Sequence, residues 1–356
     1  MVSDHRGLVA ITGANGTIGY NSVLHALRTG YRVRCIVRRE DAIGYIKAGP
    51  SLQLYADRIE YAIVPDNTIP GAYDEAVQGA KYVIHIAGVW PKPHYRPDED
   101  VYYPFVRSME EILSAAEKSD TVKRVVFTQA GAALVSTDDG DTLGTKMDKV
   151  LDVNPDAAAF QPPLPSVHHA YSGAKAYCMT YLHSHSRKSG AFSIVQVIPG
   201  TVIGPSELVS SASDALAQMD RMSKALLFNG ATPRYGFGFV HVEDCARVHV
   251  EALDEEKVQG EDIPDWFIAA ATMEEGKDGP RIWKEAGDTV EREFAEEMRN
   301  GVFIVGRENL PTNMPFRVDS RMTEEMLLGG RKFRSLEECV REVGQWYSGL
   351  VQNEKN

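Results

Sequence analysis

The sequence has no long apolar run, few cysteines and no excess of positive charge. None of the hydrophobic runs in its 356 residues approaches the ~20 residues of a transmembrane helix, and residues 1–6 lack the apolar core of a signal peptide. The 38 basic and 50 acidic residues give a formal charge of −12, which disfavours nucleic acid and anionic membranes as partners. We therefore expect a cytoplasmic protein that binds neither.

The cysteines and histidines are too scattered to form a disulfide framework or a metal site. The four cysteines are Cys35, Cys178, Cys245 and Cys339. No two of them are close in the sequence, which is typical of reduced thiols in the core of a cytosolic protein. His183 and His185 are two residues apart in a predicted helix and so point to nearly opposite sides. We expect no metal site.

The most informative stretch present is Thr12-Gly-Ala-Asn-Gly-Thr-Ile-Gly19. It follows a short apolar run at residues 8–11 and precedes an amphipathic stretch at residues 18–29, which places the glycines in a turn from strand to helix. Such a turn can cradle the pyrophosphate of a dinucleotide at the helix N-terminus, although a glycine-rich turn without a ligand is the alternative. The residues predicted to contact the cofactor here are Gly13, Asn15, Gly16, Thr17, Ile18 and Gly19.

Apolar runs alternate with amphipathic stretches along most of the chain. Further strands are predicted at residues 31–37, 59–64, 82–87, 125–128, 192–198 and 266–270, and residues 239–253 read as a strand end running into a helix. Further helices are predicted from residue 41 and at residues 73–79, 101–119, 171–187, 213–228, 281–299 and 335–351. This alternation predicts an α/β Rossmann fold, a doubly wound parallel sheet with helices on both faces.

The chain reads as one domain, residues 1–356, with a smaller lobe. We predict a nucleotide-binding core at about 1–198 and 239–272, and a substrate lobe at about 199–238 and 273–351 over the carboxyl edge of the sheet. Residues 130–169 interrupt the alternation with several aspartates and prolines. A long excursion of this kind beside a predicted site is often a functional lid.

Tyr171 and Lys175 are four residues apart in a predicted helix and so share one face. A nearby ammonium lowers the pKa of a tyrosine, which otherwise lies near ~10, and so suits it to give a proton to an alkoxide. A surface pair with the same spacing is the alternative.

Together these stretches resemble the extended short-chain dehydrogenases/reductases, in the branch of dihydroflavonol reductase, cinnamoyl-CoA reductase and yeast aldehyde/ketone reductases. The matching motifs lie at residues 12–19, 86–88, 171 with 175, 199–205, 239–244 and 331–335. The resemblance implies that Tyr171 donates a proton and that Lys175 holds the ribose and lowers the tyrosine pKa. It also implies further contacts to the cofactor from Ala87, Gly88, Asp66, Pro199, Thr201 and Val202. Asp66 matches the family residue near the adenine amine, and a helix N-cap is the alternative.

One position departs from the resembled pattern. Where the family has a serine that binds the carbonyl oxygen, this chain has Ala130, which has no hydroxyl group. Loss of one such donor costs roughly two to three orders of magnitude in a serine protease. Thr128, Ser136 and Thr201 are the candidates to replace it, and we include Thr128 with Tyr171 and Lys175 among the predicted catalytic residues.

The end of the second predicted strand favours NADPH over NAD. Sites that prefer NAD place an acidic residue there to bind the ribose 2′-hydroxyl, whereas this chain has Arg38. A guanidinium group suits a 2′-phosphate. The alternative is a solvated Arg38, with Glu40 taking the acidic role.

The leading hypothesis is an NADPH-dependent reductase of a ketone or aldehyde on a medium-sized apolar or aromatic substrate, acting as a monomer or homodimer. Trp90 and His94 are candidates to line its pocket, with Trp90 equally plausible as a core residue. Two alternatives are a nucleotide-sugar epimerase or dehydratase with bound NAD, and a non-redox or dinucleotide-sensing protein, which Ala130 favours.

Overall fold

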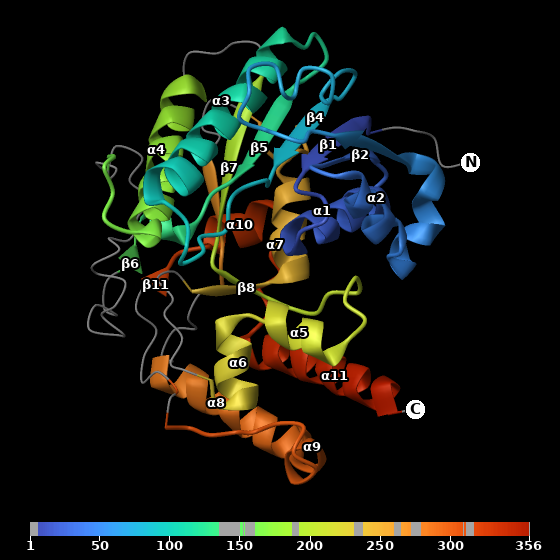
Figure 1. Cartoon of the computed structure of the whole chain (residues 1–356), viewed down its shortest axis with the longest axis vertical. Helices are drawn as coiled ribbons and strands as arrows, with labels where there is room; N and C mark the ends of the chain where they lie inside the picture. The colour runs from blue at the N-terminus through green and yellow to red at the C-terminus, as the bar shows by residue number, and fades with distance from the viewer. Residues whose placement is uncertain are drawn as a thin grey trace.

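A seven-stranded parallel sheet forms the centre of the computed structural model (Figure 1). The structure describes residues 6–134, 150–151, 153, 161–186, 192–230, 238–259, 265–271, 279–308, 310 and 317–355. From edge to edge the strands are β10 (Trp266–Ala269), β7 (Ser193–Pro199), β5 (Arg124–Thr128), β4 (Tyr82–His85), β1 (Leu8–Thr12), β2 (Arg32–Val37) and β3 (Ile59–Ile63). This order, with the chain winding outward from β1 in both directions, confirms the predicted doubly wound fold.

Helices cover both faces of the sheet because its strands are apolar on both sides. Val9 and Ile11 of β1 pack toward α1 (Thr17–Arg28) and α7 (Val242–Glu251), whereas Leu8 and Ala10 pack toward the other face. That other face carries α3 (Tyr103–Lys118) and α4 (Val167–Ser186). Successive residues of a strand point to opposite faces, so a strand buried on both sides shows no polar alternation.

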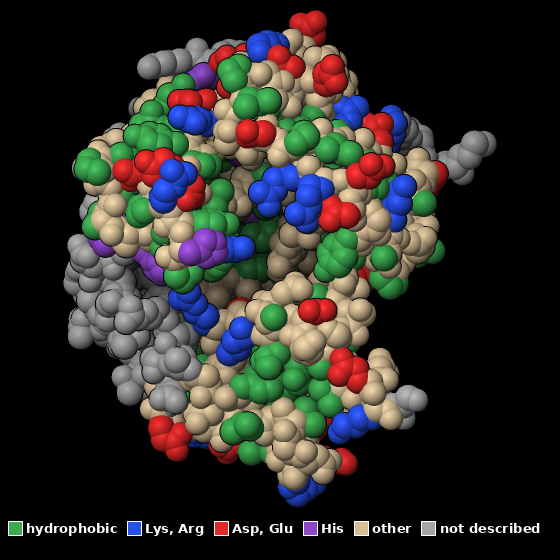
Figure 2. All heavy atoms as spheres, in the orientation of Figure 1, with side chains coloured by type: hydrophobic (Ala, Val, Ile, Leu, Met, Phe, Trp, Pro, Cys, Tyr) green, Lys and Arg blue, Asp and Glu red, His purple; other side chains and the backbone are tan. Residues whose placement is uncertain are grey.

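A separate lobe lies beyond the carboxyl ends of the strands (Figure 1). It consists of α5 (Ala212–Gln218), α6 (Arg221–Phe228), α8 (Gly279–Glu293), α9 (Ala295–Arg299) and α11 (Leu336–Lys355). Trp283, Phe294 and Tyr347 belong to its own hydrophobic core. Between the lobe and the sheet the molecular surface is hollowed, with hydrophobic side chains inside and basic side chains near the rim (Figure 2).

The remaining elements are short. They are α2 (Glu40–Lys47), the 3-10 helices η1 (Pro50–Arg58) and η3 (Gly131–Ala133), the π-helix η2 (Pro97–Tyr102), α10 (Arg321–Met326) and the strand pairs β6 (Val150–Leu151) with β11 (Arg317–Val318) and β8 (Thr201–Ile203) with β9 (Phe239–His241). Among the described residues, no helix combines the length and the apolar composition that crossing a membrane requires.

Three predicted elements differ from the structure. The predicted helix at residues 213–228 is divided into α5 and α6, because the Asp220 carboxylate accepts hydrogen bonds from the N–H groups of Met222 and Ser223 and so begins a new helix. The predicted helix at residues 281–299 is likewise broken, at Phe294, whose backbone is not helical. Residues 73–79 form a series of turns rather than a helix.

The predicted boundary of the lobe also needs correction. Leu327, Leu328 and Phe333 pack into the core on the α1 and α7 face of the sheet, although they fall within the segment 273–351 assigned to the lobe. The chain therefore returns to the sheet before it enters α11. The predicted lid at residues 130–169 lies largely outside the described residues.

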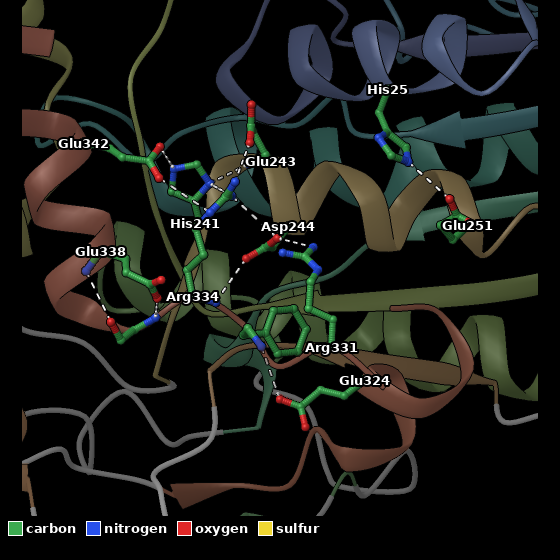
Figure 3. A network of polar contacts seen from close by, with 12 residues as sticks. His25, His241, Glu243, Asp244, Glu251, Glu324, Arg331, Arg334, Glu338 and Glu342 are labelled. Atoms are coloured by element: carbon green, nitrogen blue, oxygen red, sulfur yellow. Dashed lines mark hydrogen bonds and ion pairs between the residues drawn. The ribbon is translucent and has the colours of Figure 1, made fainter. Parts of the chain in front are cut away.

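Buried charges fix this returning segment against α7 (Figure 3). The carboxylate of Asp244, which is only 1 % exposed, accepts hydrogen bonds from Arg331 Nη2 at 2.8 Å and from the Arg334 N–H at 3.2 Å. Arg334 also pairs with Glu243 at 2.7 Å. Because a buried carboxylate is costly unless it is paired, these contacts hold the segment before α11 against α7.

We predict opposite effects for two Gly→Ala substitutions in neighbouring helices. A Cβ at Gly19 in α1 would lie 2.0 Å from the Gly13 carbonyl oxygen, whereas a Cβ at Gly44 in α2 would meet nothing within 4 Å. Gly19→Ala should lower the free energy of unfolding by at least ~1–3 kcal/mol through overpacking, and Gly44→Ala should raise it by ~0.5–1 kcal/mol. Chemical denaturation measures both; equal stability of wild type and Gly19→Ala would contradict the close approach.

Candidate active site

The glycine-rich turn leaves the first amide groups of α1 available to a ligand. Gly13 adopts a φ of 67°, in the region that favours glycine, and a Cβ there would lie 3.1 Å from the Ala87 nitrogen. Gly16 is the N-cap of α1 and provides no side-chain cap, and no acidic residue lies in the first turn. Asn15, Gly16 and Thr17 are exposed. Uncapped, exposed N–H groups at a helix start form a ready anion site.

The hydroxyl group of Thr12 joins this turn to the end of β4. Its oxygen accepts hydrogen bonds from the N–H groups of Ile86 and Ala87, each at 3.0 Å. Its own proton then goes to His85 Nδ1, 3.1 Å away. Thr12 therefore holds together the two segments predicted to contact the pyrophosphate and the ribose.

His85 extends the same network to the loop after β3. Because Nδ1 accepts from Thr12, Nε2 carries the proton and faces Ser108 Oγ at 3.4 Å, and Ser108 accepts from Asn67 Nδ2 at 2.8 Å. Burial lowers the pKa of His85 to about 3, so it stays neutral. The neighbouring Asp66 uses one oxygen to close a turn with Thr68, and its other oxygen has no hydrogen bond among the described residues.

Tyr171 and Lys175 both lie on α4 beside the ends of β4 and β5. The Tyr171 ring contacts Phe105 at 5.5 Å and Trp90 at 6.2 Å between centroids, both edge to face. Its hydroxyl group makes no hydrogen bond to any described residue. Lys175, 9 % exposed, donates to the Thr128 carbonyl oxygen at 2.8 Å and lies 4.6 Å from the centre of the Phe105 ring. The structure thus presents a free phenol beside a directed ammonium group.

The predicted effect of Lys175 on Tyr171 is not seen in this structure. Burial raises the pKa of Tyr171 to about 12, and burial lowers the pKa of Lys175 to about 8. The Lys175 ammonium group donates to the Thr128 carbonyl oxygen, and the lowering of the tyrosine pKa by Lys175 stays a prediction.

The structure gives different surroundings for the candidates to replace the missing hydroxyl group. Thr128 Oγ1 lies 2.9 Å from His249 Nε2, and His249 Nδ1 lies 2.7 Å from the Cys245 carbonyl oxygen. A carbonyl oxygen can only accept, so Nδ1 carries the proton and Nε2 accepts from Thr128. The Thr128 hydroxyl group is therefore not free to donate to a substrate, which counts against its predicted catalytic role. Ser136 lies outside the described residues, and the Thr201 hydroxyl group has no hydrogen bond among them.

The other predicted cofactor residues lie at the same edge of the sheet or near it. A Cβ at Gly88 would lie 2.4 Å from the Phe105 ring, which explains a glycine there. Pro199 ends β7, and Thr201 and Val202 begin β8. Arg38 follows β2, is exposed, and has no hydrogen bond or ion pair within the described parts of the chain.

Comparison with known proteins agrees with this geometry. The family model described as the NAD dependent epimerase/dehydratase family matches residues 9–264. The chain belongs to this epimerase/dehydratase family.

Several known proteins are similar to this chain over almost its whole length. The protein named NAD-dependent epimerase/dehydratase ALT6 of Alternaria alternata is 28% identical over 96% of this chain and 98% of its own. Ketoreductase CTB6 of Cercospora nicotianae is 28% identical over 98% of this chain and 97% of its own. The structure of yeast methylglyoxal/isovaleraldehyde reductase Gre2 with NADPH superposes with a TM-score of 0.71 at 19% identity, over 97% of this chain and 99% of that one.

Some residues of the site were not anticipated from the sequence. His85 and His249 were not singled out from the sequence as residues of the candidate site, and Phe105 was covered only by the helix predicted at residues 101–119. A possible signal was the position of both histidines within apolar segments, where an imidazole needs partners for both nitrogens. The sequence could not say which partners those would be.

Metal-ligating side chains do not cluster in the part of the chain that the structure describes. No group of three or more His, Cys, Asp or Glu residues is placed there to share an ion. His183 pairs with Asp265 and His185 with Glu117, so the two histidines have separate partners. All four cysteines are buried free thiols, as their scattered positions predict.

We predict that Lys175→Met stabilises the protein while removing a residue of the site. Burial lowers the lysine pKa from ~10.4 to about 8, which corresponds to about 3 kcal/mol as an upper bound because one pKa unit is ~1.4 kcal/mol. Between these two pH values Lys175 is protonated in the unfolded chain but largely deprotonated in the folded protein. The free energy of unfolding of the wild type therefore rises as pH rises from about 8 to ~10.4.

The free energy of unfolding of both proteins, measured at several pH values, tests this. The gain from Lys175→Met should be largest below pH ~8 and should shrink as pH rises toward ~10.4. A variant less stable than wild type at neutral pH would show that the contacts of the ammonium group outweigh its desolvation.

Proposed function

We propose that this protein is an NADPH-dependent reductase of a ketone or aldehyde. The observation that carries the proposal is the Tyr171 hydroxyl group, which has no hydrogen bond among the described residues, one helical turn from the buried Lys175 on α4. Reductases and ketoreductases among the similar proteins support it.

The residues present fit a dinucleotide with a 2′-phosphate. The uncapped start of α1 suits the pyrophosphate. Arg38 at the end of β2, which has no ion pair among the described residues, suits a phosphate on the ribose. Asp66 keeps one carboxylate oxygen for the adenine amine. NADPH, when bound, supplies the hydride for the carbonyl carbon.

The chain itself supplies the proton and the orientation. Tyr171 protonates the carbonyl oxygen as charge develops on it, and Lys175, with two of its three donors uncommitted among the described residues, holds the ribose. An ammonium group near the phenol would lower the tyrosine pKa and so favour this proton transfer. Thr201 is the remaining described candidate for a second donor to the oxygen.

The substrate that fits the entrance is medium-sized and apolar or aromatic. Trp90 is 69% exposed, so it is not the core residue that was one possibility, and it lies edge to face with Tyr171. A large exposed aromatic side chain against the proton donor can pack on a flat substrate. Phe105 supplies an apolar surface on the inner side of the same ring.

A dinucleotide-sensing protein without turnover is the second candidate, and Ala130 is the observation that favours it. At this position a reductase of the resembled group has a hydroxyl group. An NADPH-oxidation screen over carbonyl compounds separates the two functions, because only the reductase consumes the cofactor.

Cofactor choice gives the first functional prediction. Arg38→Ala should weaken NADPH binding by roughly tenfold or more, since a hydrogen bond to a charged group contributes ~1.5–3 kcal/mol, and should leave NADH binding unchanged. Arg39→Ala is the matched control, because Arg39 is also exposed but already pairs with Asp41 at 3.1 Å. Fluorescence titration of both cofactors measures this; an unchanged preference in Arg38→Ala would exclude Arg38 as the phosphate ligand.

The proposed proton donor, Tyr171, gives the second functional prediction. Tyr171→Phe keeps the ring contacts with Phe105 and Trp90 but removes the proton donor, so single-turnover hydride transfer should fall by ~10²–10⁴-fold with NADPH affinity nearly unchanged. Tyr102→Phe, at another tyrosine next to α4, is the control and should retain the wild-type rate. Wild-type transfer by Tyr171→Phe would eliminate this mechanism.

A further inference from the structure

Thr128 is held from both faces of the sheet. Its carbonyl oxygen accepts a hydrogen bond from Lys175 on α4 at 2.8 Å, and its hydroxyl group lies 2.9 Å from His249 on α7. The helices α4 and α7 cover opposite faces of the sheet. A single residue at the end of β5 therefore connects the proposed catalytic helix to a helix that does not carry any of the proposed catalytic residues.

Thr128 of β5 is not part of the strand pairing between β5 and β4. The pairing of β4 with β5 ends at His85 and Phe127, one residue before Thr128. On the other side Thr128 pairs with Val197 of β7. The carbonyl oxygen that receives Lys175 thus lies just beyond the last β4 pair, where the hydrogen bonds to Lys175 and His249 hold the residue.

His249 is suited to be that anchor. It is fully buried, and its Nδ1–H donates to the Cys245 carbonyl oxygen at 2.7 Å, which leaves Nε2 as an acceptor. Burial lowers the pKa of His249 to about 4. The imidazole is therefore neutral at ordinary pH and accepts the Thr128 proton throughout that range.

Lys175 depends on this anchor because it has few other partners. Its only hydrogen bond among the described residues is the one to Thr128, and its other close neighbours are the Phe105 ring and the two neutral imidazoles, His85 and His249. Cys178 is a further titratable neighbour, and its buried thiol is uncharged at neutral pH. None of these groups would redirect the ammonium group by charge.

We infer that His249 and Thr128 form a positioning pair, in which the imidazole fixes Thr128 and the Thr128 carbonyl oxygen in turn holds the Lys175 ammonium group at the sheet edge proposed to bind the ribose. The inference rests on the proposed reductase function. It assigns the Thr128 hydroxyl group to positioning rather than to the substrate oxygen. His249 acts through Thr128 and does not touch the reacting atoms.

Four variants test the pair, two that break the hydrogen bond and two that keep it. Thr128→Val and His249→Leu each remove one partner, whereas Thr128→Ser keeps a hydroxyl group and His249→Gln keeps an acceptor of similar reach. Thr289→Val is the matched control, since Thr289 is a buried threonine of the lobe with a hydrogen bond to Arg292. Single-turnover hydride transfer, the pH profile of kcat and thermal unfolding are measured for each.

The positioning role predicts a specific pattern. Each breaking variant should lower the transfer rate by roughly tenfold or more, as expected when a buried partner is left unpaired, with a smaller change in the substrate KM. The double variant Thr128→Val/His249→Leu should be no slower than the slower single variant, because both remove one interaction. In both breaking variants the high-pH limb of the profile should move to higher pH, since a displaced ammonium group no longer lowers the tyrosine pKa.

Other patterns would overturn it. Rates in Thr128→Val or His249→Leu that match Thr289→Val would show that the pair only fills the core. Multiplicative loss in the double variant, or an unmoved pH limb, would show that the two residues act separately. Failure of Thr128→Ser and His249→Gln to retain the rate would exclude the hydrogen bond as the cause.

One measurement keeps this inference separate from the proposed function. Nitrogen-15 chemical shifts of the wild-type histidines report whether His249 carries its proton on Nδ1, and they require no turnover. A proton on Nε2 would overturn the positioning pair even in an active reductase. An Nδ1 proton together with weakened NADPH binding in Thr128→Val would support the pair even if no carbonyl compound were reduced.

Discussion

The hydroxyl group of Thr12 is the interaction on which the site depends most. It accepts two N–H groups at the end of β4 and donates to His85, so it fixes two parallel strands where their ladder stops. In a doubly wound sheet the carboxyl ends of the strands converge at one edge, but their loops still need to be held in register. One buried hydroxyl group does this for the glycine turn and the segment after β4, and His85 carries the connection to the loop after β3.

The same edge contains a costly group. The ammonium of Lys175 is almost fully buried, and only one carbonyl oxygen and one aromatic face offset its loss of hydration among the described residues. A purely structural core would favour an apolar side chain here. A buried cation with uncommitted donors instead indicates a site prepared for a ligand, because the ligand can supply the missing partners.

The two histidines near the Lys175 ammonium group are neutral and add no charge beside it. His85 and His249 each have both ring nitrogens in hydrogen bonds, and each is too deeply buried to gain a proton at ordinary pH. They therefore fix positions without competing for charge. The lobe is held by a different means, since Asp244 is paired with Arg331 and with the backbone of Arg334. Neutral groups thus organise the site, and ionic groups fix the segment that leads into α11.

The sequence by itself determined the parallel sheet, the glycine turn and the pair Tyr171 and Lys175. These features are local: apolar runs, glycine spacing and an i, i+4 relation persist in any arrangement of the chain. It did not determine the division at Asp220, because the apolar spacing across this region is the same for one continuous helix as for two helices with an aspartate cap between them. Nor could it show that Thr128 donates to His249, that Lys175 turns to a carbonyl oxygen, or that Leu327 packs on the sheet. Those facts depend on which residues, distant in sequence, become neighbours, and the tertiary structure alone decides where a buried proton or charge finds its partner.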